Sequence, residues 1–238
     1  MSKLYHIKES IKKTLKKIPL FYSLGHKIML NKEEEKKEKL RESFKKYGVQ
    51  GIKDVQKLME TSGWEFFFSC GTLLGIIREN GVIEHDVDLD LAIMENENFS
   101  WEKLDELMST INFIPFRSFY LRDEVVEKTY IREGLQIDIY VEEIIDENYM
   151  EAPFFYRRNH INYVDRMEHS VAFMRDKRTK NILRKKIFDF YVNIPENYED
   201  ILYGNYGENW RIPIKNNEIW TAPNLIFDKN IKGYKVMH

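Results

Sequence analysis

The chain has 238 residues, of which 43% are hydrophobic and 32% charged, and its formal net charge is −2. This composition is typical of a globular protein with a sizeable buried core. The near-neutral charge argues against nucleic acid as the main partner, because proteins that bind duplexes usually carry a strongly basic surface. The single cysteine, Cys70, excludes disulfide scaffolds and cysteine-based zinc sites within one chain and suits a reducing compartment.

The N-terminal segment is basic and amphipathic. Leu4, Ile7, Ile11 and Leu15 recur at helical spacing, with lysines between them. We interpret this stripe as a helix that packs on its own domain or on a second subunit of an oligomer. The second interpretation is a peripheral contact of residues 3–20 with anionic lipid. No continuous signal-peptide core is present, and no window reaches the ~20 apolar residues of a membrane span. We therefore expect a cytoplasmic protein, which any lipid contact would bring to the inner face of the cytoplasmic membrane.

The rest of the chain predicts an α+β fold, with a mixed sheet flanked by helices. Three regions are expected: N-terminal helices at 1–62, a mixed α/β core at 63–150, and an irregular or helical region at 151–238. The predicted elements, in chain order, are a charged helix or linker at 32–47, an amphipathic helix at 52–61, an apolar strand at 64–70, a helix at 71–78, an alternating strand at 82–93, a helix at 101–110, an alternating strand at 135–141 and a basic helix at 179–192.

Three aspartates alternate with apolar residues in the strand predicted at 82–93. Asp86, Asp88 and Asp90 would share one face, because side chains two apart on a strand point the same way. Like charges on a buried face repel each other, so either one carboxylate takes up a proton or a cation sits between them, and a hard divalent cation is the natural solution. Magnesium is the usual ion, since it takes one or two carboxylates and completes its shell with water and phosphate; manganese is the alternative. We predict that Asp88 and Asp90 hold the metal.

A phosphate-binding feature precedes these acids. The apolar strand ends at Gly71 and Thr72, where a helix would begin. Helix N-termini expose N–H groups and a partial positive charge, Gly permits close backbone approach, and Thr adds a hydroxyl. Arg78 on the same helix is either a phosphate ligand or a partner in a structural ion pair. Such a cradle before an acidic strand favours phosphoryl or nucleotidyl transfer.

A third acid is expected on a neighbouring strand. Asp138 is the isolated acid of the strand predicted at 135–141, whose other residues are mainly apolar or aromatic. We predict that it is the third metal ligand or the group that accepts a proton during catalysis. Cys70 is interpreted as a small buried residue, and His85 as a catalytic group or a ring packed beside the site.

Together these residues resemble the LicD family, which includes the fukutin-related proteins. Downstream, Leu202-Tyr203-Gly204 followed by Tyr206 is similar to the family's C-terminal Tyr-Gly segment, and Asp138 matches the strand acid in between. The central residues in step with the family's motif are Gly71, Thr72, Leu73, Leu74, Gly75, Arg78, Gly81, Asp86, Asp88 and Asp90.

The sequence also departs from the family's pattern. Glu84 and His85 stand where the family usually has Pro-Trp, and Val87 replaces the middle one of its consecutive acids. These changes leave the pair formed by Asp88 and Asp90 intact, so they bear on the substrate pocket more than on the metal.

The resemblance implies a nucleotidyltransferase-like fold and a magnesium-dependent phosphotransferase. Such an enzyme moves phosphocholine, ribitol phosphate or glycerol phosphate from a CDP-activated donor to a hydroxyl of a glycan or lipid-linked saccharide, and releases CMP. We expect residues 151–238, which are rich in Tyr and Arg, to form the acceptor-binding region. Bacterial members act in the biosynthesis of surface polysaccharides such as capsule, teichoic acid or lipopolysaccharide. Two alternatives stay open: a nucleotidyltransferase that moves NMP from an NTP to a small molecule or protein, and a non-catalytic binding protein that retains the fold.

Overall fold

The computed structural model describes residues 19–156, 167–213 and 222–238. Most of the amphipathic segment predicted at residues 3–20 therefore lies outside the described residues. The helices are α2 (Pro19–Met59), α3 (Cys70–Arg78), α4 (Trp101–Thr110) and α5 (Tyr198–Tyr206). The strands are β1 (Phe66–Phe68), β2 (Asp88–Met94), β3 (Ile114–Leu121), β4 (Glu124–Arg132), β5 (Leu135–Ile144), β6 (Tyr149–Tyr156), β7 (Met167–Lys177), β8 (Ile182–Ile187), β9 (Phe190–Pro195) and β10 (Leu225–Met237).

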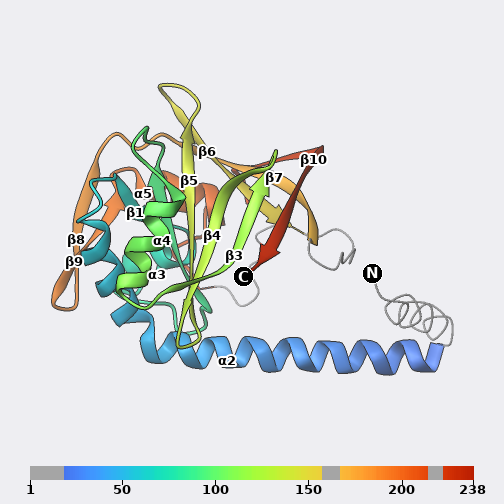
Figure 1. Ribbon diagram of the computed structural model, residues 1–238. Coiled ribbons are helices and arrows are strands. Elements are labelled where there is room, and N and C mark those ends of the chain that lie inside the picture. Colours follow the sequence, from blue (N-terminus) through green and yellow to red (C-terminus); the bar gives the residue numbers. More distant parts are fainter. Residues whose placement is uncertain (1–18, 157–166, 214–221) are drawn as a thin grey trace.

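A large sheet dominates the molecule (Figure 1). Eight strands follow the order β1-β2-β5-β4-β3-β10-β7-β6, and β5 pairs with β6 as well, so the strands from β5 to β6 form a closed ring. β2 and β5 run parallel, whereas the other pairs in this sheet are antiparallel. The prediction of an α+β fold with a mixed sheet and helices is therefore confirmed.

Helix α2 is continuous over 41 residues and joins the two segments that were predicted separately. Figure 1 shows its C-terminal half against the sheet, while its N-terminal half extends beyond the sheet. Ile52, Val55 and Met59 are fully buried on the packed half. No helix among the described residues is long and apolar enough to cross a membrane.

The strand that carries the aspartates is shorter than predicted. It begins at Asp88, so Asp86 precedes it rather than lying on it. The segment at 81–83 instead packs closely on Gly75 of α3, where an added Cβ would lie 3.0 Å from the Gly81 carbonyl oxygen and 3.1 Å from the Ile83 nitrogen. The chain therefore turns along α3 before it enters the sheet.

The basic helix predicted at 179–192 was wrong. This segment forms the β8–β9 hairpin, with the turn at Phe188, whose φ is +48°. The lysines and arginine suggested an exposed helix, but alternation places Ile187, Val192 and Ile194 in the core. The region at 151–238, predicted to be irregular or helical, also supplies β7, β10 and most of β6 to the main sheet.

Candidate active site

The register of the sheet lines up polar side chains from five neighbouring strands. Residues paired directly across strands present their side chains on the same face. Successive partners form two adjacent rows, one of Asp90, Asp138, Thr129 and Arg117, and one of Ala92, Tyr140, Glu127, Phe119 and Lys235. The site is thus assembled by long-range pairing between β2, β5, β4, β3 and β10.

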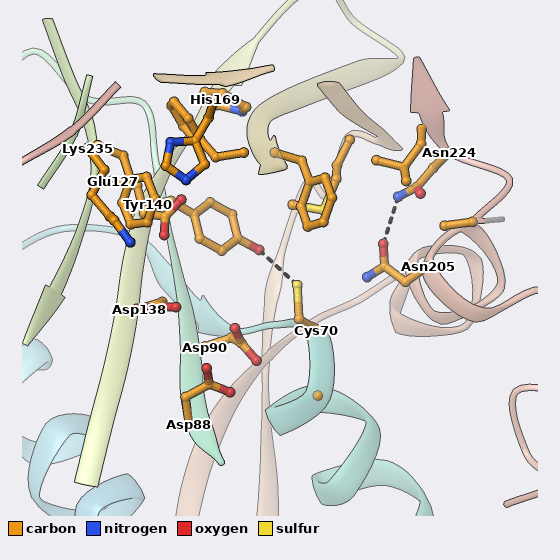
Figure 2. A pocket seen from close by; sticks show the side chains of 18 of the residues that line it. Cys70, Asp88, Asp90, Glu127, Asp138, Tyr140, His169, Asn205, Asn224 and Lys235 are labelled. Carbon is orange, nitrogen blue, oxygen red and sulfur yellow. Dashed lines mark hydrogen bonds between the residues drawn. The ribbon is translucent and has the colours of Figure 1, made fainter. Parts of the chain in front are cut away.

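These rows open onto a pocket of about 440 Å³. In Figure 2, Asp88, Asp90 and Asp138 lie at one end of the pocket, Glu127 lies beside Lys235 and Tyr140, and aromatic rings line much of the rest. On the far wall, the Asn224 amide donates to the Asn205 carbonyl oxygen at 2.7 Å. The acidic lining residues are Asp86, Asp88, Asp90, Glu127 and Asp138, and the aromatic ones are Phe119, Tyr140, Phe154, Phe155, His169 and Tyr206.

The side chains of Asp88 and Asp90 lie next to each other, facing the start of α3 (Figure 2). Burial raises the pKa of both carboxyls well above the ordinary value, and repulsion from neighbouring aspartates raises it further. Burial also raises the pKa of Asp86 to about 6. A hard divalent cation fits this donor set, because it would replace repulsion with attraction and accept carboxylate oxygens.

Asp138 lies in the same pocket but is held by protein groups. The Thr129 hydroxyl donates to its Oδ1, and Nη2 of Arg117 is 3.3 Å from both of its carboxylate oxygens. Nε of Arg117 also donates to Thr129 Oγ1 at 2.6 Å. Within the described ranges, no group of three or more His, Cys, Asp or Glu side chains stands ready to hold a metal. The structure therefore places Asp138 beside the predicted metal pair, with a guanidinium as its partner.

The three predicted phosphate-binding residues do not all reach the pocket. Gly71 lines it, and a Cβ there would lie 2.6 Å from Oδ2 of Asp86, so a larger residue would force the Asp86 carboxylate to shift. Thr72 is buried and its hydroxyl accepts from the Asp90 backbone N–H at 2.9 Å, which ties α3 to β2. Arg78 is outside the lining; its Nε donates to Glu79 at 2.7 Å and its Nη1 to the Trp210 carbonyl oxygen at 3.3 Å.

Half-buried Cys70 and buried Tyr140 lie side by side at the pocket wall. The Tyr140 hydroxyl lies 2.5 Å from Ser69 Oγ and 3.6 Å from Cys70 Sγ. Burial raises the pKa of the Cys70 thiol, so the thiol stays protonated and is a poor nucleophile. His85, by contrast, is exposed and does not line the pocket.

The charged and imidazole side chains of the pocket that sequence reasoning missed are Arg117, Glu127, His169 and Lys235. Burial, followed by repulsion from Asp138, raises the pKa of Glu127 well above its ordinary value. The enrichment of aromatic and β-branched residues at 114–121 and 124–132 could have indicated the strands that carry Arg117 and Glu127. No local pattern indicates that these strands meet β5 and β10.

Two curated relatives match short segments of the chain. The uncharacterized protein RP689 of Rickettsia prowazekii is 31% identical over 72 residues, which cover 26% of this chain and 27% of that protein. The uncharacterized protein RT0683 of Rickettsia typhi is 33% identical over 55 residues, covering 23% of this chain and 18% of that protein. The matched part therefore spans about a quarter of the first relative and less of the second.

A family match covers a larger part of the chain. The model described as "LicD/FKTN/FKRP, nucleotidyltransferase domain" matches residues 63–197, which is more than half of the sequence. This range contains α3, β2 and β5, and with them Gly71 and the three predicted metal-binding aspartates. The chain belongs to the LicD family.

Proposed function

We propose that this chain transfers a phospho-alcohol from a CDP-activated donor to a hydroxyl of a surface glycan and releases CMP. Membership of the LicD family indicates a transferase, with phosphotransfer or glycan modification as its general activity. The observation that carries the finer proposal is that the half-buried side chains of Asp88 and Asp90 lie next to each other in a pocket of about 440 Å³. A cation would relieve the repulsion between these carboxylates, and a cation held there would attract a diphosphate.

Asp88 and Asp90 are the residues that would hold Mg²⁺, or Mn²⁺ in its place. The bound ion would neutralise charge on the diphosphate. In the proposed reaction the oxygen of the acceptor hydroxyl bonds to the phosphorus that carries the alcohol, and the bond from this phosphorus to the CMP oxygen breaks. Asp138 would accept the hydroxyl proton or serve as a third ligand. Gly71 allows the donor to approach the backbone at the start of α3.

The aromatic end of the pocket suits the acceptor. Flat rings such as Tyr206 and Phe154 pack well on sugars and polyols, and the amides of Asn205 and Asn224 can exchange hydrogen bonds with hydroxyls. We propose a glycan or a lipid-linked saccharide as acceptor, used in the cytoplasm. A lipid-linked acceptor would bring the enzyme to the inner face of the membrane, where residues 3–20 would provide peripheral contact.

A second candidate is transfer of NMP from an NTP to a small molecule or protein, within a nucleotidyltransferase-like fold. The description of the matching family model, which names a nucleotidyltransferase domain, favours keeping this candidate. The same carboxylates would serve both reactions. The released product separates them, because phospho-alcohol transfer yields CMP and nucleotidyl transfer yields pyrophosphate.

The test is incubation of the full chain with Mg²⁺, a panel of CDP-alcohols and candidate glycan acceptors, with chromatography of the nucleotide products. We expect CMP to appear only when both a CDP-alcohol and an acceptor are present. Pyrophosphate release from NTPs, without CMP from any CDP-alcohol, would replace this proposal with the second candidate.

Asp88→Asn provides the matched variant for that assay. Replacing the carboxylate with an amide keeps size and removes a charge that the cation needs, so we expect turnover to fall at least ~100-fold while the circular dichroism spectrum is retained. Asp146→Asn, on an exposed turn, is the control and should keep wild-type turnover. Full activity of Asp88→Asn would contradict the metal assignment.

A further inference from the structure

The proposed function brings a diphosphate into a pocket that five carboxylates line. A metal ion offsets part of that charge, but the remaining acids would still repel the phosphate oxygens. A protein cation that faces the same space is therefore needed. Arg78, predicted to serve this purpose, contacts Glu79 and Trp210 and does not line the pocket.

We propose that Arg117 is the guanidinium that binds the substrate phosphate, opposite Asp88 and Asp90. This inference rests on the proposed function for the identity of the phosphate compound. Among the described lining residues, the side chains with a permanent positive charge are Arg117 and Lys235. Arg117 lies in the row that contains Asp90 and Asp138, whereas Lys235 lies in the neighbouring row, beyond Glu127 and Phe119.

The contacts of Arg117 fix its guanidinium and leave one edge available. Nε and Nη2 contact Thr129 and Asp138, and the guanidinium carbon lies 5.5 Å from the centre of the Phe119 ring. Within the described part of the chain, Nη1 makes no hydrogen bond. A planar guanidinium held along one edge can donate from the other without losing its orientation, which suits a phosphate oxygen.

The contact with Asp138 is also one that a ligand can compete for. Its two N–O distances of 3.3 Å are long for a charge-assisted hydrogen bond, which is normally about 2.7–2.9 Å. Arg117 therefore neutralises Asp138 in the ligand-free chain without forming a close bidentate ion pair with it. When a phosphate group or a metal enters, Nη2 can turn to the phosphate while Nε keeps its hydrogen bond to Thr129.

The test measures binding of inorganic pyrophosphate to the full chain by titration calorimetry, with Mg²⁺ in one arm and EDTA in the other. We expect Arg117→Gln to weaken binding at least about tenfold in both arms, and Arg117→Lys to recover part of the loss. Asp138→Asn should tighten binding in the EDTA arm, because it removes a negative charge and releases the guanidinium. If the ion pair between Arg117 and Asp138 were merely structural, Asp138→Asn would weaken pyrophosphate binding in the EDTA arm.

Arg132→Gln is the matched control. Arg132 also lies on a strand, its side chain is 15% exposed against 20% for Arg117, and it pairs with Asp54 outside the pocket. It should bind pyrophosphate like the wild type. The inference is overturned if Arg117→Gln binds normally, if wild type binds in neither arm, or if Arg78→Gln or Lys235→Met causes the larger loss. Absence of CMP release with intact pyrophosphate binding would instead count against the proposed function alone.

Discussion

At the scale of single residues, Asp88 and Asp90 are unfavourable for folding in the absence of a cation. Burial raises the pKa of both carboxyls well above the ordinary value, and repulsion from neighbouring aspartates, Asp86 and Asp138 among them, raises the pKa of each further. Active sites commonly retain such arrangements, because the groups that bind a charged ligand are destabilising until the ligand arrives.

Asp90→Asn should therefore stabilise the metal-free protein while it abolishes transfer. An amide of the same size removes the repulsion and still allows the Asp90 backbone N–H to donate to Thr72. We expect the free energy of unfolding in EDTA to rise by about 1–2 kcal/mol, measured by urea denaturation.

Asp189→Asn is the control, because loss of this carboxylate should not raise the free energy of unfolding. Asp189 is exposed and its carboxylate accepts from Lys53 Nζ at 2.8 Å, which lowers its pKa. Removing this charge should leave stability unchanged or slightly lower. If Asp90→Asn is less stable than wild type in EDTA, the carboxylate is already compensated in the folded chain and the argument for a required cation fails.

At the scale of elements, α3 is held against the segment that leads into β2 by a glycine. Gly75→Ala places a methyl group 3.0–3.2 Å from the backbone at 81–83, and backbone cannot move aside as a side-chain end can. We expect a loss of about 1–3 kcal/mol in unfolding free energy and reduced activity, because Asp86 and Asp88 follow directly.

Gly48→Ala is the matched substitution in α2. Its added methyl would make ordinary contact with the Phe44 ring at 3.5 Å, and alanine is the better helix former by about 1 kcal/mol. Thermal unfolding of the two variants should therefore shift in opposite directions. A stabilised Gly75→Ala would show that the segment at 81–83 is not fixed by α3.

Sequence patterns predicted the elements whose signal is local. The alternation around Asp88 and Asp90 and the apolar run before Gly71 indicated β2, β1 and the start of α3. The basic β8–β9 hairpin was misassigned because short runs of lysine suit an exposed helix as well as an exposed strand face. Arg117 was missed because its place beside Asp138 depends on the register of β3, β4 and β5, which no local pattern encodes.

At the scale of the whole molecule, closure of the sheet buries a second pair of acids. Glu142 on β5 and Asp176 on β7 are brought to one face through the pairing of both strands with β6. Glu142 Oε2 has no hydrogen-bond partner within the described residues, whereas Asp176 accepts from the Asn224 amide at 3.0 Å. Burial raises the pKa of both carboxyls, in Asp176 from 3.8 to about 7.

This shift makes stability depend on pH in a defined direction. Between pH 3.8 and about 7 the folded protein keeps a proton on Asp176 that the unfolded chain has lost. The protonated Asp176 therefore contributes fully to the free energy of unfolding below the unfolded pKa. This contribution is lost as pH rises through the folded pKa, at up to about 1.4 kcal/mol per pH unit. Asp176→Asn mimics the protonated form, keeps an oxygen for the Asn224 amide, and should remove this loss.

The measurement is urea denaturation of wild type, Asp176→Asn and the exposed control Asp146→Asn at pH 5, 6, 7 and 8. The advantage of Asp176→Asn over wild type should grow from pH 5 to about pH 7 and then level off. The control should follow the wild type throughout. Parallel curves for wild type and Asp176→Asn would mean that Asp176 is ionised in the folded protein across this range, so that closing the sheet at β6 would not force a proton onto the buried pair.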